Sequence, residues 1–228
     1  MPRFLFLLIA VLLFSVETLP AKTLHVAQSG NGGDGLTWET AFPSVTEAIS
    51  NATHDDHIWV KGGIYPENVT LIPGISLYGG FSGTETHDQF DLRDWKKHRT
   101  ILSGTAESDR ILGPMVTGAD QTVLDGLILQ LGLEGILCRD ASMEVKHCII
   151  RYNNAGEGAG IHCDRGMMVV EDCVFHRNQG WDGVGAYFLR GSHGILRNCV
   201  FYVHWTGLPI NPGSGGIVRS AGEGTVVS

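Results

Sequence analysis

The ten residues VVEDCVFHRN, 169–178, occur three times in related form and decide the fold. Residues 144–153 read EVKHCIIRYN and residues 195–204 read ILRNCVFYVH, which places Cys148, Cys173 and Cys199 at the same point of each copy. A second motif keeps the same spacing, as GILC at 135–138, GIHC at 160–163 and GAYF at 185–188. A structural repeat of about 25 residues therefore organises the second half of the chain.

Each repeat predicts several short strands separated by Gly, Asn or Asp turns, with too few residues for a helix. In VVEDCVFHRN the inward and outward positions alternate until Asp172, where the phase slips, so we expect a bend there. One unit does not bury its own apolar side, so the units must stack edge to edge. The leucine-rich pattern is absent, and propeller blades need about 40 residues or more. A parallel β-helix of about 22–26 residues per coil remains.

The repeat also predicts which residues lie above one another on successive coils. Matching strands of one column are expected to begin at Leu77, Ile101, Val123, Val145, Val170 and Leu196. Buried structural ladders are expected from Cys138 and Cys163, from Cys148, Cys173 and Cys199, and from Asn153 and Asn178. Rungs lie about 4.8 Å apart, so bridged cysteines are feasible, but we favour free thiols packed as small hydrophobes. Outward charges should alternate in sign and pair across rungs as Lys146–Glu171–Arg197, Arg139–Asp164 and Asp140–Arg165.

The N-terminus has the pattern of a secretory signal peptide. Arg3 precedes an apolar run at residues 4–16 that is too short to cross a membrane, and Ala21 precedes Lys22. We expect residues 1–21 to be removed, although a retained anchor is the alternative. No later stretch reaches 18 apolar residues, so no transmembrane segment is expected after cleavage. The sequence thus predicts a secreted or cell-surface protein.

Composition limits the class of partner. Only 18% of the 228 residues are charged, and 31 glycines indicate many turns and few helices. The net charge of −8 argues against nucleic acid, because nucleic-acid binding rewards a basic surface. Neither Cys-x-x-Cys nor a Cys/His cluster at zinc spacing occurs, so no metal site and no cofactor are expected.

The chain divides into a cap and a solenoid. Residues 22–57 are expected to form a strand, a Gly-rich loop and a short helix, because Ser44 and Glu47 make a capping box before an apolar face. This cap should cover the exposed end of the solenoid formed by residues 58–228. Residues 80–99 are polar and aperiodic and should form a side loop. We expect the solenoid to continue beyond Ser228 or another chain to cover its last edge, and we favour the first.

Four stretches resemble the N-terminal coils of secreted bacterial right-handed parallel β-helix proteins of the pectate-lyase-like superfamily. They are GNGGDGLTWETAF (30–42), AISNATHDDHIWVKGGIYPENV (48–69), ISLYGGFSGTET (75–86) and TILSG (100–104). The resemblance covers nearly all of the mature chain and implies an all-β, right-handed, single-stranded parallel β-helix. It does not imply one activity, because the superfamily includes lyases, hydrolases and adhesins.

One surface carries the residue types of a ligand site. His162 and Tyr187 should share an outward column, His176 and Arg177 should end a strand, and Trp181 should lie with Asp182 in the turn GWDG. Aromatic and polar groups of this kind stack on sugar rings and hydrogen-bond their hydroxyls, so ligand binding is assigned to Trp181, Tyr187, His162 and Arg177. General acid–base catalysis would require side-chain atoms to converge within about 3 Å, and the candidates for it are His162, His176, Asp182 and Tyr187.

Three functions remain open from the sequence, and the third is a purely structural stalk with no wall-specific ligand. We prefer an extracellular or cell-surface protein that binds polysaccharide, or another surface ligand, along its solenoid wall. The alternative is a carbohydrate-active enzyme on acidic polysaccharide, a lyase rather than a hydrolase, and only this alternative would call for Ca²⁺. The oligomeric state is left undecided by the sequence.

Overall fold

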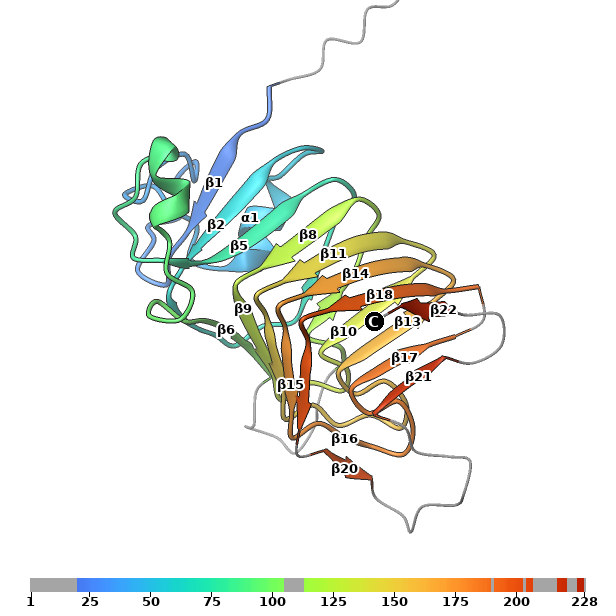
Figure 1. Cartoon of the computed structure of the whole chain (residues 1–228). Coiled ribbons are helices and arrows are strands. Elements are labelled where there is room, and N and C mark those ends of the chain that lie inside the picture. The colour runs from blue at the N-terminus through green and yellow to red at the C-terminus, as the bar shows by residue number, and fades with distance from the viewer. Residues whose placement is uncertain are drawn as a thin grey trace, which may run out of the picture.

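The computed structural model describes residues 20–104, 113–189, 191–202, 204–206, 217–220 and 225–227, which form a right-handed parallel β-helix (Figure 1). The chain winds in successive coils, and strands at the same place on successive coils pair in parallel. Three sheets, which we call A, B and C, make the three walls of the solenoid. The predicted fold class is therefore confirmed.

The strands are short in every wall. Sheet A contains β1 (Thr23–Val26), β2 (His57–Lys61), β5 (Ser76–Phe81), β8 (Thr122–Asp125), β11 (Ser142–Lys146), β14 (Met167–Glu171), β18 (His193–Arg197) and β22 (Thr225–Val227). Sheet B contains β3 (Gly63–Tyr65), β6 (Thr100–Ser103), β9 (Leu127–Gln130), β12 (Ile149–Arg151), β15 (Val174–His176) and β19 (Val200–Tyr202). Sheet C contains β4 (Val69–Thr70), β7 (Val116–Thr117), β10 (Ile136–Arg139), β13 (Ile161–Asp164), β17 (Ala186–Phe188) and β21 (Val218–Ser220). A further pair joins β16 (Gln179–Gly180) to β20 (Trp205–Thr206).

The core between the walls is built from side chains stacked rung on rung. Cys138 pairs in register with Cys163, and both are fully buried. The backbone N–H of Cys148 donates to Sγ of Cys173 at 3.4 Å, and Cys199 occupies the next coil. All five are free thiols in the structure. The cysteines thus lie in two files and fill the core as small apolar groups.

The expected column of strand starts was wrong at two places. Leu77 and Val145 both pair in register with Leu124, whereas Val123, the residue we had expected in this column, faces outward. Ile101 belongs to β6 of sheet B and not to sheet A. The side chain of Leu124 is fully buried, and because neighbouring strand residues face opposite sides, its burial places Val123 on the other face.

The bend between sheets A and B falls on one left-handed residue in three successive coils. These residues are His147, Asp172 and Asn198, with φ angles of 49°, 52° and 51°. His, Asp and Asn are the non-glycine residues most often found in this conformation. The phase slip that predicted a bend at Asp172 is therefore confirmed, and its physical basis is one left-handed residue per coil.

A buried ladder of asparagines supports the turn that follows sheet B. Asn153 and Asn178 are fully buried. Oδ1 of Asn178 accepts hydrogen bonds from both the backbone N and Nδ2 of Asn153, each at 3.1 Å. Nδ2 of Asn178 donates to the carbonyl of Ile150 at 3.0 Å. The amides thus satisfy backbone groups that the turn would otherwise leave buried without partners.

Outward charges pair across rungs in only part of the expected pattern. Arg197 binds Glu171 at 2.6 Å and Arg165 binds Asp140 at 2.7 Å, as expected. Lys146 instead binds Glu144 of its own strand at 2.7 Å, although Glu171 lies beside it in register. Similarly, Arg139 is in register with Asp164, whose carboxylate binds the neighbouring Arg165 at 3.0 Å. Glu144 and Lys146 are two apart on one strand and share a face, whereas Arg165 follows Asp164 in the turn; in both cases a residue near in sequence competes with the cross-strand partner.

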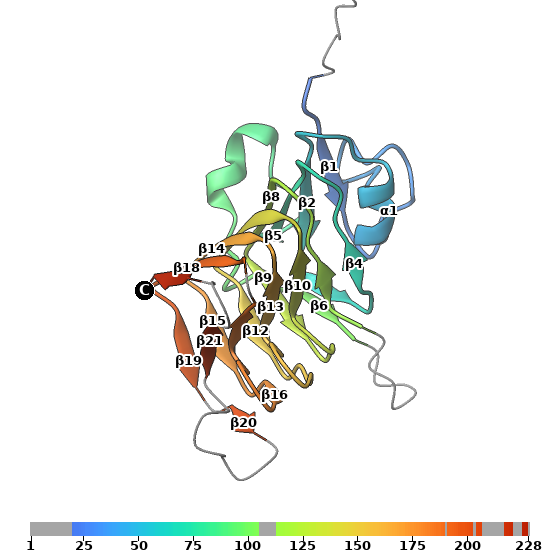
Figure 2. The same cartoon turned by 90° about the vertical axis from the view of Figure 1, so that its right-hand side faces the viewer.

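A short helix lies at the N-terminal end of the solenoid, as the capping box predicted. Helix α1 (Val45–Ser50) begins after Ser44, whose Oγ accepts a hydrogen bond from the backbone N of Glu47 at 3.2 Å. Its buried residues Val45, Ala48 and Ile49 join the hydrophobic core. Figure 2 shows α1 beside β1 and β4, where it covers the first coil.

The side loop, residues 82–99, leaves the solenoid where other coils bend with one residue. It contains the 3-10 helix η1 (His87–Leu92) and docks by Trp95 onto Gly80 of β5 and onto Gly126, at the bend after β8. A Cβ placed on Gly126 would lie 2.9 Å from that of Trp95, so the position must stay small. Beneath the loop, Trp59 stacks on Phe81 with ring centroids 4.5 Å apart, on the outer face of sheet A. The first coils therefore have a second, aromatic layer outside the core.

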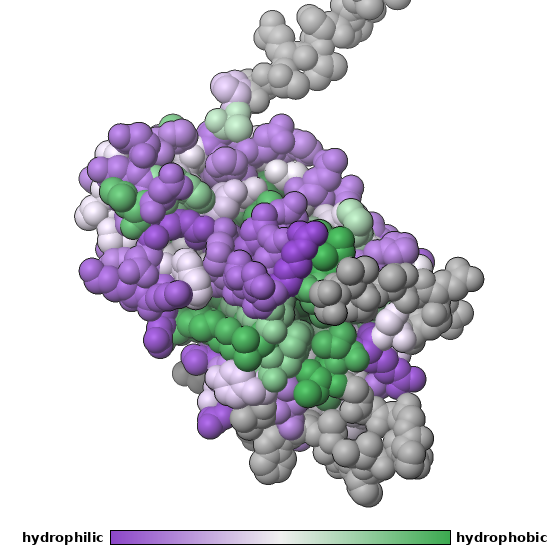
Figure 3. Space-filling model, in the orientation of Figure 1, coloured by the Kyte–Doolittle hydropathy of each residue, from purple (hydrophilic) through white to green (hydrophobic). Residues whose placement is uncertain are grey.

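The surface changes character along the solenoid. Over the N-terminal coils and the side loop it is mostly hydrophilic, whereas hydrophobic residues gather toward the C-terminal coils (Figure 3). Val200 and Ile217 are 52% and 47% exposed there. No helix among the described residues is long and apolar enough to cross a membrane. The expected signal peptide, residues 1–21, lies almost wholly outside the described residues.

Candidate functional site

The predicted ligand column lies on the outer face of sheet C. His162 of β13 pairs in register with Tyr187 of β17, and Tyr187 pairs with Arg219 of β21. The rings of His162 and Tyr187 meet edge to face, with centroids 5.6 Å apart and an interplanar angle of 86°. In β13 the flanking Ile161 and Cys163 are buried in the core, and this alternation turns His162 outward.

The turns beside sheet C fold over this column and partly cover it. Gly183 has a φ of 50°, and a Cβ at this position would lie 2.7 Å from the Cβ of Tyr187. Only glycine allows both this left-handed backbone and so close an approach. As a result Tyr187 is only 6% exposed and His162 is half-buried. The column is therefore more enclosed than an outward strand position predicts.

Trp181 and Asp182 lie in this covering turn, and they differ in the burial of their side chains. The side chain of Trp181 is 64% exposed, while its backbone N–H donates to the carbonyl of Gly156 at 2.8 Å. Asp182 is buried, and its carboxylate forms an ion pair with Arg219 on the next coil. The ion pair and the backbone bond hold the turn in place, so Trp181 projects from a fixed support.

The charges around the column make it weakly acidic. Burial lowers the pKa of His162, so its imidazole is neutral at pH 7. Burial, together with the nearby carboxylate of Glu157, raises the pKa of Tyr187, which keeps its hydroxyl protonated. The charged groups acting on His162 are Glu134, Arg139, Glu157 and Asp164. Asp164 is paired with Arg165 and Asp182 with Arg219, so Glu134 and Glu157 against Arg139 leave a small negative excess, which favours a neutral ligand over a polyanion.

Two predicted site residues lie on the neighbouring wall. His176 ends β15 of sheet B, where it stacks on Tyr202 with centroids 5.0 Å apart. Arg177 donates to the hydroxyl of Tyr152 at 2.7 Å. The structure thus brings His162 and Tyr187 into ring contact, with Trp181 and Asp182 in the turn beside Tyr187, whereas His176 and Arg177 belong to an aromatic group on sheet B. The expected four-residue acid–base set does not assemble.

A second polar group, which is not predicted from the sequence, lies at the bend between sheets A and B. Nδ1 of His147 is 2.8 Å from Oδ1 of Asp125, and the guanidinium of Arg93 binds Oδ2 of Asp125 at 2.6 Å. A cavity of about 490 Å³ adjoins the group, and Lys96 and Asp172 are among the residues that line it. The bend position itself was readable from the aligned repeats, but its partners were not, because Arg93 lies in the aperiodic side loop.

This second group has a structural role that needs no ligand. Arg93 belongs to the side loop and Asp125 to β8, so their buried ion pair fastens the loop to sheet A. Trp95 packs against His147 with ring centroids 5.4 Å apart. Among the described residues, no group of three or more His, Cys, Asp or Glu side chains comes together to hold a metal ion.

The comparisons with known proteins agree with the geometry of the fold. Residues 115–221 match the family model described as right handed beta helix region. Two similar solved structures are a pectin methylesterase in complex with hexasaccharide VII and a mutant pectin methylesterase in complex with hexasaccharide IV. Both have 13% sequence identity and a TM-score of 0.56. No curated protein matches the chain.

The overlap with these structures covers most of this chain but only part of theirs. The first covers 91% of this chain and 66% of the methylesterase chain, and the second 89% and 61%. This chain therefore spans about two thirds of their length or less. At 13% identity the likeness shows a shared parallel β-helix fold and does not transfer an activity.

Proposed function

We propose that this chain is an exported, extracellular or cell-surface β-helix protein that binds polysaccharide along sheet C. Two observations outside the site support the proposal. The N-terminal sequence has the pattern of a signal peptide, and the similar solved structures are proteins in complex with hexasaccharides. The acidic surroundings of His162 favour a neutral polysaccharide as the ligand.

The observation that carries the proposal is the exposure of Trp181. Trp is among the more buried residue types on average, yet this side chain is 64% exposed on a turn held by two interactions. A fixed, exposed indole offers a flat apolar face to a sugar ring at little cost in conformational entropy. Tyr187 lies under this turn and His162 under the matching turn of the preceding coil, both as neutral polar groups.

Binding to a panel of soluble neutral and acidic polysaccharides tests the proposal. Trp181→Ala should weaken binding of the preferred neutral polysaccharide by about tenfold or more, equal to about 1.4 kcal/mol. Tyr202→Ala is the matched control, because Tyr202 is an exposed aromatic residue (46%) on sheet B. Equal losses in both variants, or no binding to any polysaccharide, would contradict the proposal.

A lyase acting on acidic polysaccharide is the second candidate, and one observation favours it. The cavity at the bend is lined by Lys96, which could neutralise a uronate carboxylate, and by His147, whose imidazole is oriented by Asp125 to accept a proton. Formation of unsaturated uronate ends, followed by ultraviolet absorbance, is the assay. His147→Asn keeps a residue that tolerates the left-handed bend and should abolish the activity. Absence of absorbance with every uronate polymer would exclude this candidate.

A further inference from the structure

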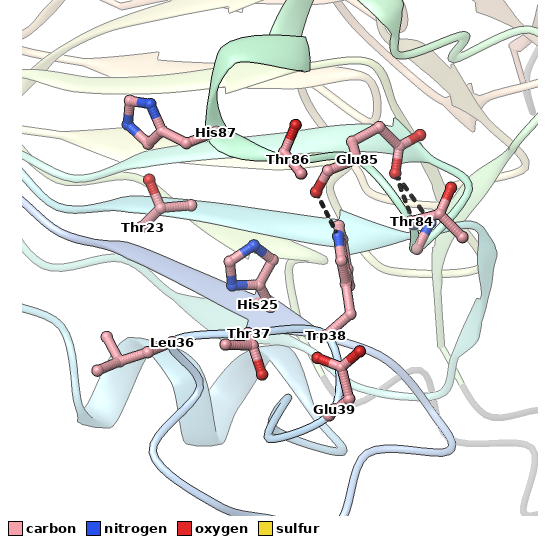
Figure 4. Close-up of a pocket in the computed structure, with 11 residues that line it drawn as sticks. Thr23, His25, Leu36, Thr37, Trp38, Glu39, Thr84, Glu85, Thr86 and His87 are labelled. Atoms are coloured by element: carbon pink, nitrogen blue, oxygen red, sulfur yellow. Dashed lines mark hydrogen bonds between the residues drawn. The ribbon is translucent and has the colours of Figure 1, made fainter.

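A cavity of about 630 Å³ lies at the N-terminal end of the molecule, far along the solenoid from Trp181. Its walls come from β1, from the cap loop at residues 36–39 and from the side loop at residues 83–87. Figure 4 shows His25 and Trp38 side by side, with Thr86 and His87 of the side loop facing them. Ligand cavities in proteins span about 300–1,000 Å³, so this one has room for a small molecule.

His25 brings a hydrogen-bond acceptor to this cavity. It is only 8% exposed, and its Nδ1 lies 3.0 Å from the carbonyl oxygen of Gly35. A carbonyl only accepts, so Nδ1 carries the proton and Nε2 has the free lone pair. Burial lowers the pKa of His25, which keeps the imidazole neutral at pH 7.

The Nε2 atom of His25 has no hydrogen-bond partner among the described residues, although the ring lines the cavity. Among the described residues, Nε2 of His25 is not one of the fully buried side-chain nitrogens that lack a partner, so its lone pair is open to the cavity. A ligand that donates a hydrogen bond into the cavity can pair with this lone pair. The ligand should therefore bear hydroxyl or amino groups.

Two of the remaining polar side chains of the lining already have partners. Nε1 of Trp38 donates to the carbonyl of Glu85 at 2.9 Å, which fixes the indole. The carboxylate of Glu85 accepts from the backbone N–H groups of residues 82–84 at 2.7 to 3.0 Å. Burial opposes ionisation of Glu85, but these bonds prevail and lower its pKa.

The charge of the lining selects against anions. Glu39 and Glu85 are acidic, and neither Lys nor Arg is among the lining residues. Four threonines (Thr23, Thr37, Thr84 and Thr86) provide hydroxyl groups, and Leu36 and Trp38 provide apolar surface. An ammonium group could pair only with the exposed carboxylate of Glu39, because the carboxylate of Glu85 already accepts hydrogen bonds from backbone N–H groups. Hydroxyl groups on a compact apolar ring match the lining better than either charge.

We infer that this cavity is a second binding site, which takes one or two units of a neutral sugar, with a hydroxyl donating to Nε2 of His25. The site is separate from the Trp181 surface, so Trp181→Ala should leave it intact. Its existence does not depend on whether the sheet C wall binds a polymer.

Saturation-transfer NMR on the whole protein tests the inference, with neutral mono- and disaccharides, glucosamine and galacturonate as probes. Neutral sugars should give signals, and galacturonate should give none. His25→Asn retains an amide donor for the Gly35 carbonyl but removes the Nε2 acceptor, so affinity should fall at least about tenfold. Thr23→Tyr, on the half-buried edge of the cavity, should block it and also abolish the signals.

The control is Asp140→Asn, at an exposed position on a distant coil, which should leave neutral-sugar binding unchanged, and Glu39→Gln serves to detect a cation. Circular dichroism establishes that each variant is folded, and Thr23→Tyr decides the question if His25→Asn is not. Three results would overturn the inference: no neutral sugar binds, Thr23→Tyr binds as well as the parent protein, or glucosamine alone binds and loses its signal in Glu39→Gln. The last result would identify a site for cations.

Discussion

Nδ1 of His147 and Oδ1 of Asp125 lie 2.8 Å apart and join the bend of one coil to the strand of the coil before it. The other carboxylate oxygen of Asp125 binds Arg93 at 2.6 Å, and both side chains of that ion pair are about nine-tenths buried. Asp125 therefore connects the side loop, sheet A and the bend. A single side chain holds three segments that are distant in sequence.

Asp125→Ala should destabilise the protein strongly, because it leaves the guanidinium of Arg93 buried without a counter-charge. Breaking a buried pair in this way costs about 3–5 kcal/mol, measurable by urea unfolding. The side loop should also become a substrate for trypsin at Lys96 and Lys97. Asp140→Asn is the control, since the Asp140–Arg165 pair is exposed and should have no measurable effect. A resistant side loop in Asp125→Ala would contradict the assignment.

Asn178→Ala tests the buried amide ladder. The change removes three hydrogen bonds and leaves buried groups of Asn153 and Ile150 unsatisfied, so we expect a loss of about 2–4 kcal/mol. Asn154→Ala is a matched control, because the side chain of Asn154 is exposed beside the ladder. Urea unfolding of the two variants should differ clearly, and similar values would argue that the ladder contributes little.

Cys199 should be the most reactive thiol of the folded protein. A hydrogen bond from the Cys173 thiol lowers the pKa of Cys199 to about 7, whereas interactions with the neighbouring thiols and burial raise that of Cys173. Cys199 is also the one cysteine with partial exposure. Iodoacetamide at pH 8 should modify one site per chain, located by peptide mass spectrometry and absent in Cys199→Ser. Rapid labelling of Cys173 in folded protein would be inconsistent with this packing.

Stability should fall as the pH drops below about 6.5. Burial is the main cause that lowers the folded-state pKa of His25, His57 and His162, so the unfolded chain binds more protons than the folded one just below the ordinary pKa of histidine. Above that pH these histidines are neutral in both states and cost no stability. As the pH falls from there toward their lowered folded-state pKa values, the free energy of unfolding decreases. Melting temperatures from pH 8 to 5 measure this slope. His162→Gln should reduce it, and a melting temperature that rises with acidification would refute the sign.

The solenoid was predictable because its core repeats in the sequence. Cys148, Cys173 and Cys199 mark the rungs directly, since inward positions of a stacked coil meet their own copies and accept little variation in size. The register of individual strands was less predictable from the sequence. Val123 and Leu124 are both apolar, so hydrophobicity alone could not decide which of them faces inward, and Ile101 was assigned to the wrong wall for the same reason.

The outer aromatic layer and the N-terminal cavity escaped prediction because their parts do not repeat. Trp38, Trp59 and Phe90 come from the cap loop, a strand and the side loop, and they meet only after the chain has folded. The sequence contained one indication of this outer layer. Trp59 lies between the inward residues Ile58 and Val60, so its large ring had to face outward and needed a cover.

The single left-handed residue at each bend also has an evolutionary consequence. Because successive coils make the same bend between sheets A and B, a tandem duplication or loss of one whole period joins compatible geometries on both sides. The solenoid can therefore gain or lose whole coils during evolution. Insertions of other sizes are accommodated only as side loops, such as the one that Arg93 anchors to sheet A.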